Sequence, residues 1–374
     1  MNIIVIKDKL KEGVDIVSRV AGDHPTLSIL KNILVEAGKD KIRLIATNLE
    51  VGVQYLVAGK VVEEGSLTVP ANLMAQVLGN LDQDRLNIKT KDAVLEITTD
   101  NYEAKVEGVS AEEFPLMPKL GSEEHYLEIE GDVLRGAMER VLLATSFSEL
   151  RPELNAVIMK HTTDTLVFAA TDSFRLGEAT LYDREFTSTS PDEFQILLPL
   201  KTAQEVLRIF RGGPSGQGGK VRIYRDGNQV LFRNEQVEFI SRLSEGNFPD
   251  YQAIIPREFQ ADITLDREEF ANALKLASVF GGGGTELVLR SAGKKGVEVF
   301  SRSEKLGENT YVLPARISGE LTEANFNSRY LLDGLRAVGG KEIVFSIGED
   351  NRPAFIKSQG DSAYFYIVMP ILRA

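Results

Sequence analysis

Residues 69–81 read V-P-A-N-L-M-A-Q-V-L-G-N-L, residues 198–210 read L-P-L-K-T-A-Q-E-V-L-R-I-F, and residues 326–338 read F-N-S-R-Y-L-L-D-G-L-R-A-V. Each stretch has apolar residues at helical spacing behind Pro70, Pro199 or Asn327, which are suited to the start of a helix. These three residues are 129 and then 128 positions apart. Three helices in register, each flanked by strand-like segments, predict a chain built from three copies of one unit.

A second amphipathic helix is expected near the start of each unit, with an acidic residue (Asp8, Asp132 or Asp266) placed to cap it or to lie in its first turn. The predicted apolar stripes are Leu10, Val14 and Val17, then Leu134, Met138 and Val141, then Phe270, Leu274 and Ala277. Short runs rich in Val, Ile, Phe and Tyr, such as residues 42–47 and 166–170, predict strands between the helices. The predicted class is α+β, with two helices packed on antiparallel sheets in each of three similar domains.

Two polar segments that begin with proline, residues 118–126 and 256–262, are typical of linkers between modules. They divide the chain into predicted domains 1–119, 125–256 and 257–374, which are N-terminal, central and C-terminal.

The composition limits the classes of function. The chain of 374 residues has no cysteine, which excludes disulfides and thiolate metal sites. No apolar window approaches the length of a membrane span, so we expect a cytoplasmic protein without membrane contact. The net charge of −12 taken alone argues against nucleic-acid binding, although a protein can be acidic outside and basic within.

No convincing catalytic set is present. The glycine-rich stretches 212–219 and 281–284 lack the spacing and context of a phosphate loop. His24, His125 and His161 lie far apart in the sequence, and Asp172–Ser173 has no obvious histidine base beside it. We predict no catalytic residue, metal or cofactor, and therefore no enzyme activity. Two alternatives stay open, a nucleotide-dependent enzyme that uses the glycine-rich loops and a multidomain adhesion or scaffold protein.

Four motifs carry a resemblance that spans the whole chain. They are A-T-D-S-F-R-L at residues 170–176, V-M-P at 368–370, E-G-N-F-P-D-Y at 245–251 and H-P-T-L-S-I-L at 24–30. In this combination the chain resembles the bacterial DNA polymerase III beta subunit family, the sliding clamps. The resemblance implies the DNA clamp fold and a ring-shaped homodimer that encircles duplex DNA. It also implies a non-catalytic processivity subunit, although the family is often catalogued with DNA-directed DNA polymerase activity.

The resemblance places a groove for partner peptides between the second and third domains. Its expected partners are the catalytic subunit of the replicative polymerase, the clamp loader and other proteins with a clamp-binding motif. The implied groove residues are Leu154, Thr171, Ser173, Phe174, Arg175, Leu176, Pro249, Ile254, Asn327, Tyr330, Ile367, Val368, Met369, Pro370 and Ile371. Ser173–Phe174 replace the Gly–His common in the family, and the tail I-L-R-A also differs, so a different peptide preference is expected.

Sequence-independent contact with double-stranded DNA is expected from basic residues that face the hole. The candidates are His24, Arg135, Arg140, Lys201, Arg208, Arg211, Arg329 and Arg336, with His24 at a position where well-known members have a basic residue. A head-to-tail contact between the first domain of one chain and the third of the other is expected at Ala104, Val106, Val279 and Phe280.

Overall fold

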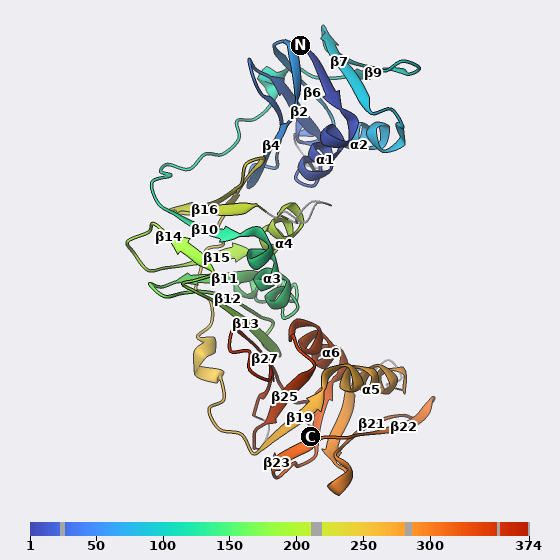
Figure 1. Ribbon diagram of the computed structural model, residues 1–374, viewed down its shortest axis with the longest axis vertical. Helices are drawn as coiled ribbons and strands as arrows, with labels where there is room; N and C mark the ends of the chain where they lie inside the picture. The colour runs from blue at the N-terminus through green and yellow to red at the C-terminus, as the bar shows by residue number, and fades with distance from the viewer. Residues whose placement is uncertain (23–26, 211–218, 281–285, 350–351, 373–374) are drawn as a thin grey trace. The chain divides into compact units, whose positions relative to one another are not determined.

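The computed structural model describes residues 1–22, 27–210, 219–280, 286–349 and 352–372. Within these residues the same order of elements occurs three times: a strand, a helix, five strands, a helix and three strands (Figure 1). Every ladder that joins these strands is antiparallel, for example β1 with β7 and β19 with β25. The predicted α+β class with three similar domains is confirmed.

The first repeat comprises β1 (Asn2–Ile6), α1 (Lys7–Val17), β2 (Asn32–Ala37), β3 (Ile42–Thr47), β4 (Val51–Val57), β5 (Gly59–Glu63), β6 (Gly65–Pro70), α2 (Ala71–Asn80), β7 (Arg85–Lys91), β8 (Val94–Thr98) and β9 (Glu103–Glu107). The second comprises β10 (Tyr126–Glu130), α3 (Gly131–Leu142), β11 (Ala156–His161), β12 (Thr165–Thr171), β13 (Arg175–Tyr182), β14 (Phe186–Ser188), β15 (Phe194–Pro199), α4 (Leu200–Ile209), β16 (Lys220–Asp226), β17 (Gln229–Arg233) and β18 (Val237–Arg242). The third comprises β19 (Ala261–Asp266), α5 (Arg267–Phe280), β20 (Glu286–Ser291), β21 (Val297–Ser303), β22 (Gly307–Leu313), β23 (Arg316–Gly319), β24 (Ala324–Asn327), α6 (Ser328–Ala337), β25 (Glu342–Ile347), β26 (Ala354–Ser358) and β27 (Tyr364–Val368).

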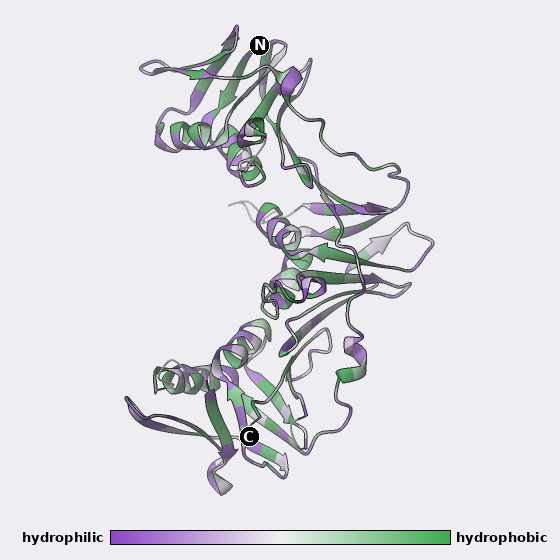
Figure 2. Ribbon diagram, turned by 180° about the vertical axis from the view of Figure 1, so that it is seen from behind, coloured by the Kyte–Doolittle hydropathy of each residue, from purple (hydrophilic) through white to green (hydrophobic). Residues whose placement is uncertain are grey.

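The helices form where the apolar periodicity predicts them. All nine residues of the predicted stripes on α1, α3 and α5 are buried, and Figure 2 shows hydrophobic and hydrophilic residues alternating along the helices. Asp266 caps α5, because its Oδ1 accepts hydrogen bonds from the backbone N–H groups of Glu268 and Glu269, both at 3.0 Å. Pro70 and Pro199 end strands one residue before their helices begin, so the predicted place in the first helical turn was wrong by one position.

The chain folds into two compact units, and the central repeat contributes to both. One unit, formed by Met1–Gly131, Thr187–Ser190 and Arg208–Leu243, holds a five-stranded sheet (β5-β1-β7-β8-β9) and a nine-stranded sheet (β14-β10-β16-β17-β18-β4-β3-β2-β6). The other, formed by Asp132–Phe186, Pro191–Leu207 and Ser244–Ala374, holds a nine-stranded sheet (β15-β11-β12-β13-β27-β26-β25-β19-β23) and a four-stranded sheet (β22-β21-β20-β24). In each nine-stranded sheet, strands of successive repeats pair directly, β4 with β18 and β13 with β27.

The segment after β9 is held against the first nine-stranded sheet. Met117 and Leu120 pack on a buried cluster of Tyr224, Leu231 and Ile240. Met117 also lies over Gly52, where an added Cβ would stand 2.9 Å from the methionine side chain, so the close approach requires glycine. Farther along, both carboxylate oxygens of Glu123 accept hydrogen bonds from Arg233, at 2.6 and 2.9 Å. This linker is therefore fixed by apolar contacts at its centre and by a bidentate ion pair near its end.

No helix in the described ranges is long and apolar enough to cross a membrane.

The buried stripe of α5 gives a direct test of the predicted core. Phe270 is fully buried and its ring lies 6.0 Å from that of Phe345 on β25. Replacing Phe270 with Ala should lower the free energy of unfolding by about 3–5 kcal/mol, because a large cavity is left. The measurement is urea unfolding followed by circular dichroism. Lys275→Ala, an exposed change on the same helix, is the control and should shift stability by less than about 0.5 kcal/mol; equal effects of the two changes would contradict the assignment.

Candidate functional site

The turn between β12 and β13 is held by its own side chains. The Thr171 hydroxyl donates to the Arg175 carbonyl at 2.7 Å and accepts from the Ser173 N–H at 3.1 Å. Asp172 Oδ1 accepts from the N–H groups of Phe174 at 3.0 Å and Arg175 at 3.1 Å. The turn places Ser173 in the left-handed region, with φ +78°, where a glycine is favoured. As a result the ring of Phe174 projects outward and is 59% exposed.

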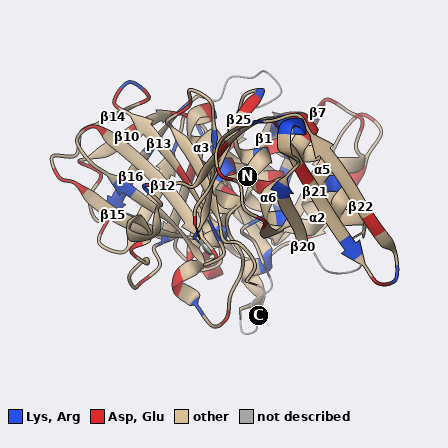
Figure 3. Ribbon diagram, turned by 90° about the horizontal axis from the view of Figure 1, so that it is seen from below, with Lys and Arg blue, Asp and Glu red and all other residues tan. Residues whose placement is uncertain are grey.

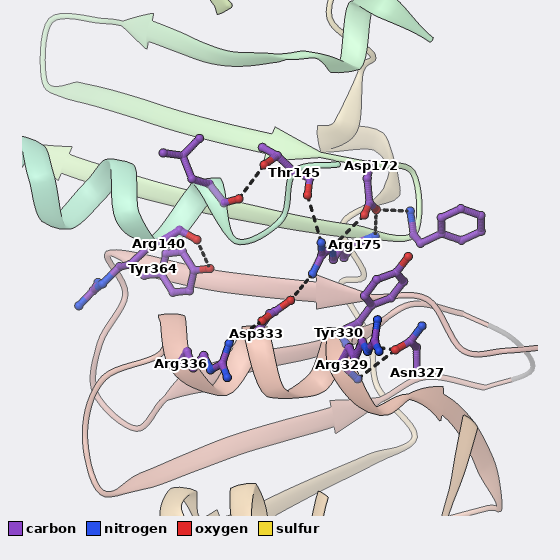
Figure 4. Close-up of polar contacts among 12 residues, drawn as sticks. Arg140, Thr145, Asp172, Arg175, Asn327, Arg329, Tyr330, Asp333, Arg336 and Tyr364 are labelled. Carbon is purple, nitrogen blue, oxygen red and sulfur yellow. Dashed lines mark hydrogen bonds and ion pairs between the residues drawn. The ribbon is translucent and has the colours of Figure 1, made fainter. Parts of the chain in front are cut away.

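Arg175 is largely buried at the start of β13, and each of its three side-chain nitrogens already has a partner. Nε donates to Asp172 Oδ2 at 2.9 Å, Nη1 to Asp333 Oδ2 at 2.6 Å, and Nη2 to the Thr145 carbonyl at 3.1 Å (Figure 4). The side chain is 10% exposed, and that of Asp172 is 5% exposed. Burial by itself lowers the pKa of Arg175, but the interactions with Tyr366, Asp333 and Asp172 outweigh it and raise the pKa. The guanidinium is therefore held charged and in a fixed position.

Aromatic rings cover this ion-pair network. The guanidinium carbon of Arg175 lies 4.4 Å from the ring centroid of Tyr330, at the first turn of α6. The Tyr330 ring in turn lies 6.5 Å from that of Phe174, with 27° between the two planes. Asn327 caps α6 through hydrogen bonds from the N–H groups of Arg329 and Tyr330. The predicted residues Phe174, Arg175, Asn327 and Tyr330 therefore lie together.

The C-terminal segment runs beside the same turn. β27 pairs with β13, with Val368 opposite Arg175 and Ile367 opposite Leu176. After β27, the Met369 N–H donates to the Phe174 carbonyl at 2.8 Å, and the Ile371 N–H donates to the Asn325 carbonyl at 2.7 Å. The predicted tail residues are thus brought to the turn by backbone hydrogen bonds.

An apolar cluster underlies this surface. Leu176 and Ile367 pack in it with Phe248 and Tyr251, which come from the E-G-N-F-P-D-Y motif. Pro249 and Ile254 are exposed on the segment that Phe248 and Tyr251 anchor. Four of the predicted residues are fully buried and support the surface from below: Leu154, Leu176, Ile367 and Val368. The accessible apolar groups are therefore fewer than the sequence predicted.

Three residues that contact the turn were not predicted as members of this site. Thr145 and Asp333 bind Arg175, and Arg151 Nη1 donates to Ser173 Oγ at 2.7 Å. Arg151 follows the exposed apolar residues Phe147 and Leu150, an arrangement visible in the sequence. Asp333 gave no such signal, because it appears only as an acidic residue on an amphipathic helix.

The candidate DNA-facing residues within the described ranges lie on helices. Arg135 and Arg140 are on α3, Lys201 and Arg208 on α4, and Arg329 and Arg336 on α6. Several have acidic neighbours: Arg135 pairs with Asp132 and Glu139, Arg140 with Asp361, and Arg336 with Asp333. Figure 3 likewise shows Lys and Arg interspersed with Asp and Glu. His24 and Arg211 lie outside the described residues.

The candidate interface residues lie at a sheet edge and at a helix end. Ala104 and Val106 are on β9, an edge strand of the five-stranded sheet. The Val106 side chain is buried in its own sheet, so it offers only its backbone at that edge. Val279 and Phe280 end α5, and Val279 is 65% exposed.

The described part of the chain contains no group of acidic or histidine side chains arranged to hold a metal ion. His161 is buried between the rings of Phe186 and Phe194. The carboxylate of Asp172 serves the turn and Arg175, and the Ser173 hydroxyl accepts from Arg151. These contacts account for the Asp172–Ser173 pair as part of the turn. The glycine-rich stretches lie in or next to the undescribed segments.

Comparison with known proteins assigns each of the three repeats to a domain of one protein family. Residues 1–118 match the N-terminal domain, residues 128–250 the central domain and residues 252–372 the C-terminal domain of the DNA polymerase III beta subunit. The chain is 28% identical over 376 residues to the beta sliding clamp of Synechococcus elongatus and 26% identical over 383 residues to that of Bacillus subtilis, with 99% of each chain covered.

Solved structures agree with this assignment. The DNA polymerase sliding clamp from Bacillus subtilis superposes with a TM-score of 0.91 at 26% identity, with both chains fully covered. The beta subunit from Thermotoga maritima, at 24% identity, shares the fold with a TM-score of 0.90 over the whole of both chains. The fold is therefore that of a three-domain DNA clamp. The chain belongs to the DNA polymerase III beta subunit family and acts as a sliding clamp of the replicative polymerase. The family is a non-catalytic processivity factor, so the prediction that the chain is not an enzyme is confirmed.

Proposed function

We propose that two copies of this chain close head to tail into a ring around duplex DNA. In this arrangement the surface formed by residues 171–176, Tyr330 and residues 369–371, here called the peptide site, binds short segments of the polymerase, the clamp loader and other clamp-binding proteins. The observation that carries this proposal is the meeting of the β12–β13 turn, the start of α6 and the C-terminal segment at one place. Together with the family assignment, it supports a docking site beside the C-terminal segment.

We further propose that the protein works in the cytoplasm, with the replication machinery, and that the predicted boundaries 1–119, 125–256 and 257–374 delimit its domains.

Free sheet edges support the ring. β9 ends the five-stranded sheet of one unit, and β22 ends the four-stranded sheet of the other. An edge of each kind on every chain permits a heterologous contact, which closes when the rotation is right. Next to β9, a cavity of about 410 Å³ is lined by apolar residues such as Leu73 and Val77 and by polar ones such as Gln76, Asn80 and Asp82. We propose that this cavity receives Val279 and Phe280 of the second copy.

The interface proposal predicts the effect of a charge at Phe280. Phe280→Asp should convert the dimer into a monomer at micromolar concentration, because burying an unpaired carboxylate at the interface, next to Asp82 of the cavity, is costly. Light scattering measures the mass of both proteins. Lys275→Asp, on an exposed position of the same helix, is the control and should leave the dimer intact. A wild-type protein that is monomeric at this concentration would contradict the ring.

The DNA proposal rests on basic residues that meet phosphates without reading bases. Arg208→Glu together with Arg211→Glu should reduce retention on circular DNA, and the difference from the wild type should shrink as salt rises, because the variant has fewer phosphate contacts to lose. The control reverses two exposed strand lysines, Lys60→Glu with Lys357→Glu, and so makes the same change in net charge. Equal retention by the two double variants would mean that Arg208 and Arg211 do not face DNA.

The peptide proposal predicts that the tail is required for binding. Burying two or three apolar anchors contributes about 1.5–3 kcal/mol each, and ordering a flexible peptide offsets part of this, so we expect a modest and exchangeable affinity. Deleting residues 369–374 should abolish binding of a fluorescein-labelled, polymerase-derived clamp-binding peptide while the dimer persists. Phe174→Ala should weaken binding, and Leu116→Ala, which removes an apolar side chain 94% exposed elsewhere, should not. Fluorescence anisotropy is the measurement, and unchanged binding after the deletion would show that the site is misplaced.

A further inference from the structure

A guanidinium in a peptide groove can donate hydrogen bonds to peptide carbonyls, but the environment of Arg175 does not favour that role. The Arg175 side chain is largely buried, Tyr330 covers one face of the guanidinium, and Nε, Nη1 and Nη2 already donate to Asp172, Asp333 and Thr145. Three of its five N–H groups are thus already used, and its side chain is only 10% exposed, which leaves little of the guanidinium within reach of a peptide. Arg175 therefore contributes to the peptide site through the groups that it holds in place.

The partners of Arg175 come from separate parts of the fold. Thr145 follows α3 and Asp172 lies in the β12–β13 turn, both in the central repeat, whereas Asp333 and Tyr330 lie on α6 of the C-terminal repeat. Asp333 is three residues after Tyr330 and therefore on the same side of the helix. The ion pair between Arg175 and Asp333 thus fixes α6 against the turn (Figure 4). It also fixes the ring of Tyr330 beside the ring of Phe174.

We propose that Asp333 and Asp172 are positioning residues of the peptide site, and that Arg175 acts through Tyr330 and Phe174 instead of touching the peptide. This inference rests on the proposed function, because it assumes that the peptide binds at these rings. In this arrangement the two carboxylates hold the guanidinium, the guanidinium holds the Tyr330 ring, and the two rings present a preformed aromatic surface. The peptide chemistry that fits such a surface is an aromatic or flat apolar side chain.

Asp333 is the better residue to test. Asp172 also accepts two backbone hydrogen bonds within the turn, so its replacement would disturb the turn directly. Asp333→Asn keeps the shape of the side chain and removes its charge. A matched control exists in Asp361→Asn, because Asp361 pairs with Arg140 at 3.6 Å and also joins the C-terminal repeat to α3, away from the rings.

The experiment measures binding of the fluorescein-labelled polymerase peptide to full-length dimers by anisotropy. Asp333→Asn should weaken binding about tenfold, equivalent to the loss of one charge-assisted contact, and Asp361→Asn should leave it unchanged. Tyr330→Leu should also weaken binding, and the double variant Asp333→Asn with Tyr330→Leu should bind no more weakly than Tyr330→Leu alone. Non-additivity of this kind is expected if Asp333 acts through Tyr330. Additive losses, or equal losses in Asp333→Asn and Asp361→Asn, would overturn the inference by indicating general loosening.

A second variant covers the possibility that Asp333→Asn does not fold. Arg175→Lys keeps the positive charge but cannot span three partners with a planar fork, so it should weaken binding to a similar extent. Binding equal to wild type in Arg175→Lys would overturn the inference. Failure of the proposed function has a different signature: the wild-type protein itself would not bind the peptide. If the wild type binds and the Asp333→Asn variant binds equally well, only the positioning role is wrong.

Discussion

Backbone hydrogen bonds between β4 and β18, and between β13 and β27, join strands that belong to successive repeats. Each repeat alone would leave these strands as exposed edges, which invite pairing with other chains. Pairing them inside the chain produces two nine-stranded sheets and leaves β9 and β22 among the strands that end a sheet. The same constraint that fuses the repeats therefore also leaves edges available for a second copy.

The β13–β27 pairing also creates the surface that we propose as the peptide site. It places Leu176 opposite Ile367 and brings the tail to the carbonyl of Phe174. It carries α6 to the β12–β13 turn as well, where Asp333 meets Arg175. An ion pair that is largely buried contributes little net stability but is strongly sensitive to the loss of one partner. Such a pair is therefore suited to fixing the position of aromatic rings at a surface.

Much of the fold could be predicted from the sequence because the repeat is periodic. The buried faces of α1, α3 and α5 follow the spacing of residues such as Leu10, Leu134 and Phe270, and spacing is a local property. Several strands were not predicted, among them β5, β6, β7, β13, β14 and β15. The segment R-L-N-I-K-T-K at Arg85–Lys91, for example, is too polar to stand out. Strand pairing between repeats is not local, and no residue pattern along β4 indicates β18 as its neighbour.

The site could be predicted only in part, for the same reason. Its turn and tail were found through a family resemblance, whereas Arg175 and Asp333 are 158 positions apart and meet through tertiary structure. The burial of Leu154 and Val368 likewise depends on how the elements pack in three dimensions, which the sequence pattern does not reveal. Val106 was expected at an interface edge, and it does lie on the edge strand β9. The sequence did not reveal that its side chain is buried.

The linker after β9 joins the first repeat to the central one covalently, but it is not the only connection between them. Five residue pairs, from Val237 with Tyr55 to Ser241 with Val51, hold the first repeat to β18 independently of the linker. A protease that cut the linker near residue 119 would divide the polypeptide, yet the ladder and the cluster around Tyr224 would keep the fragments in one particle. Excising the first repeat as a domain would instead expose the edge of β18. The compact units of this chain are therefore not the units that its sequence repeats.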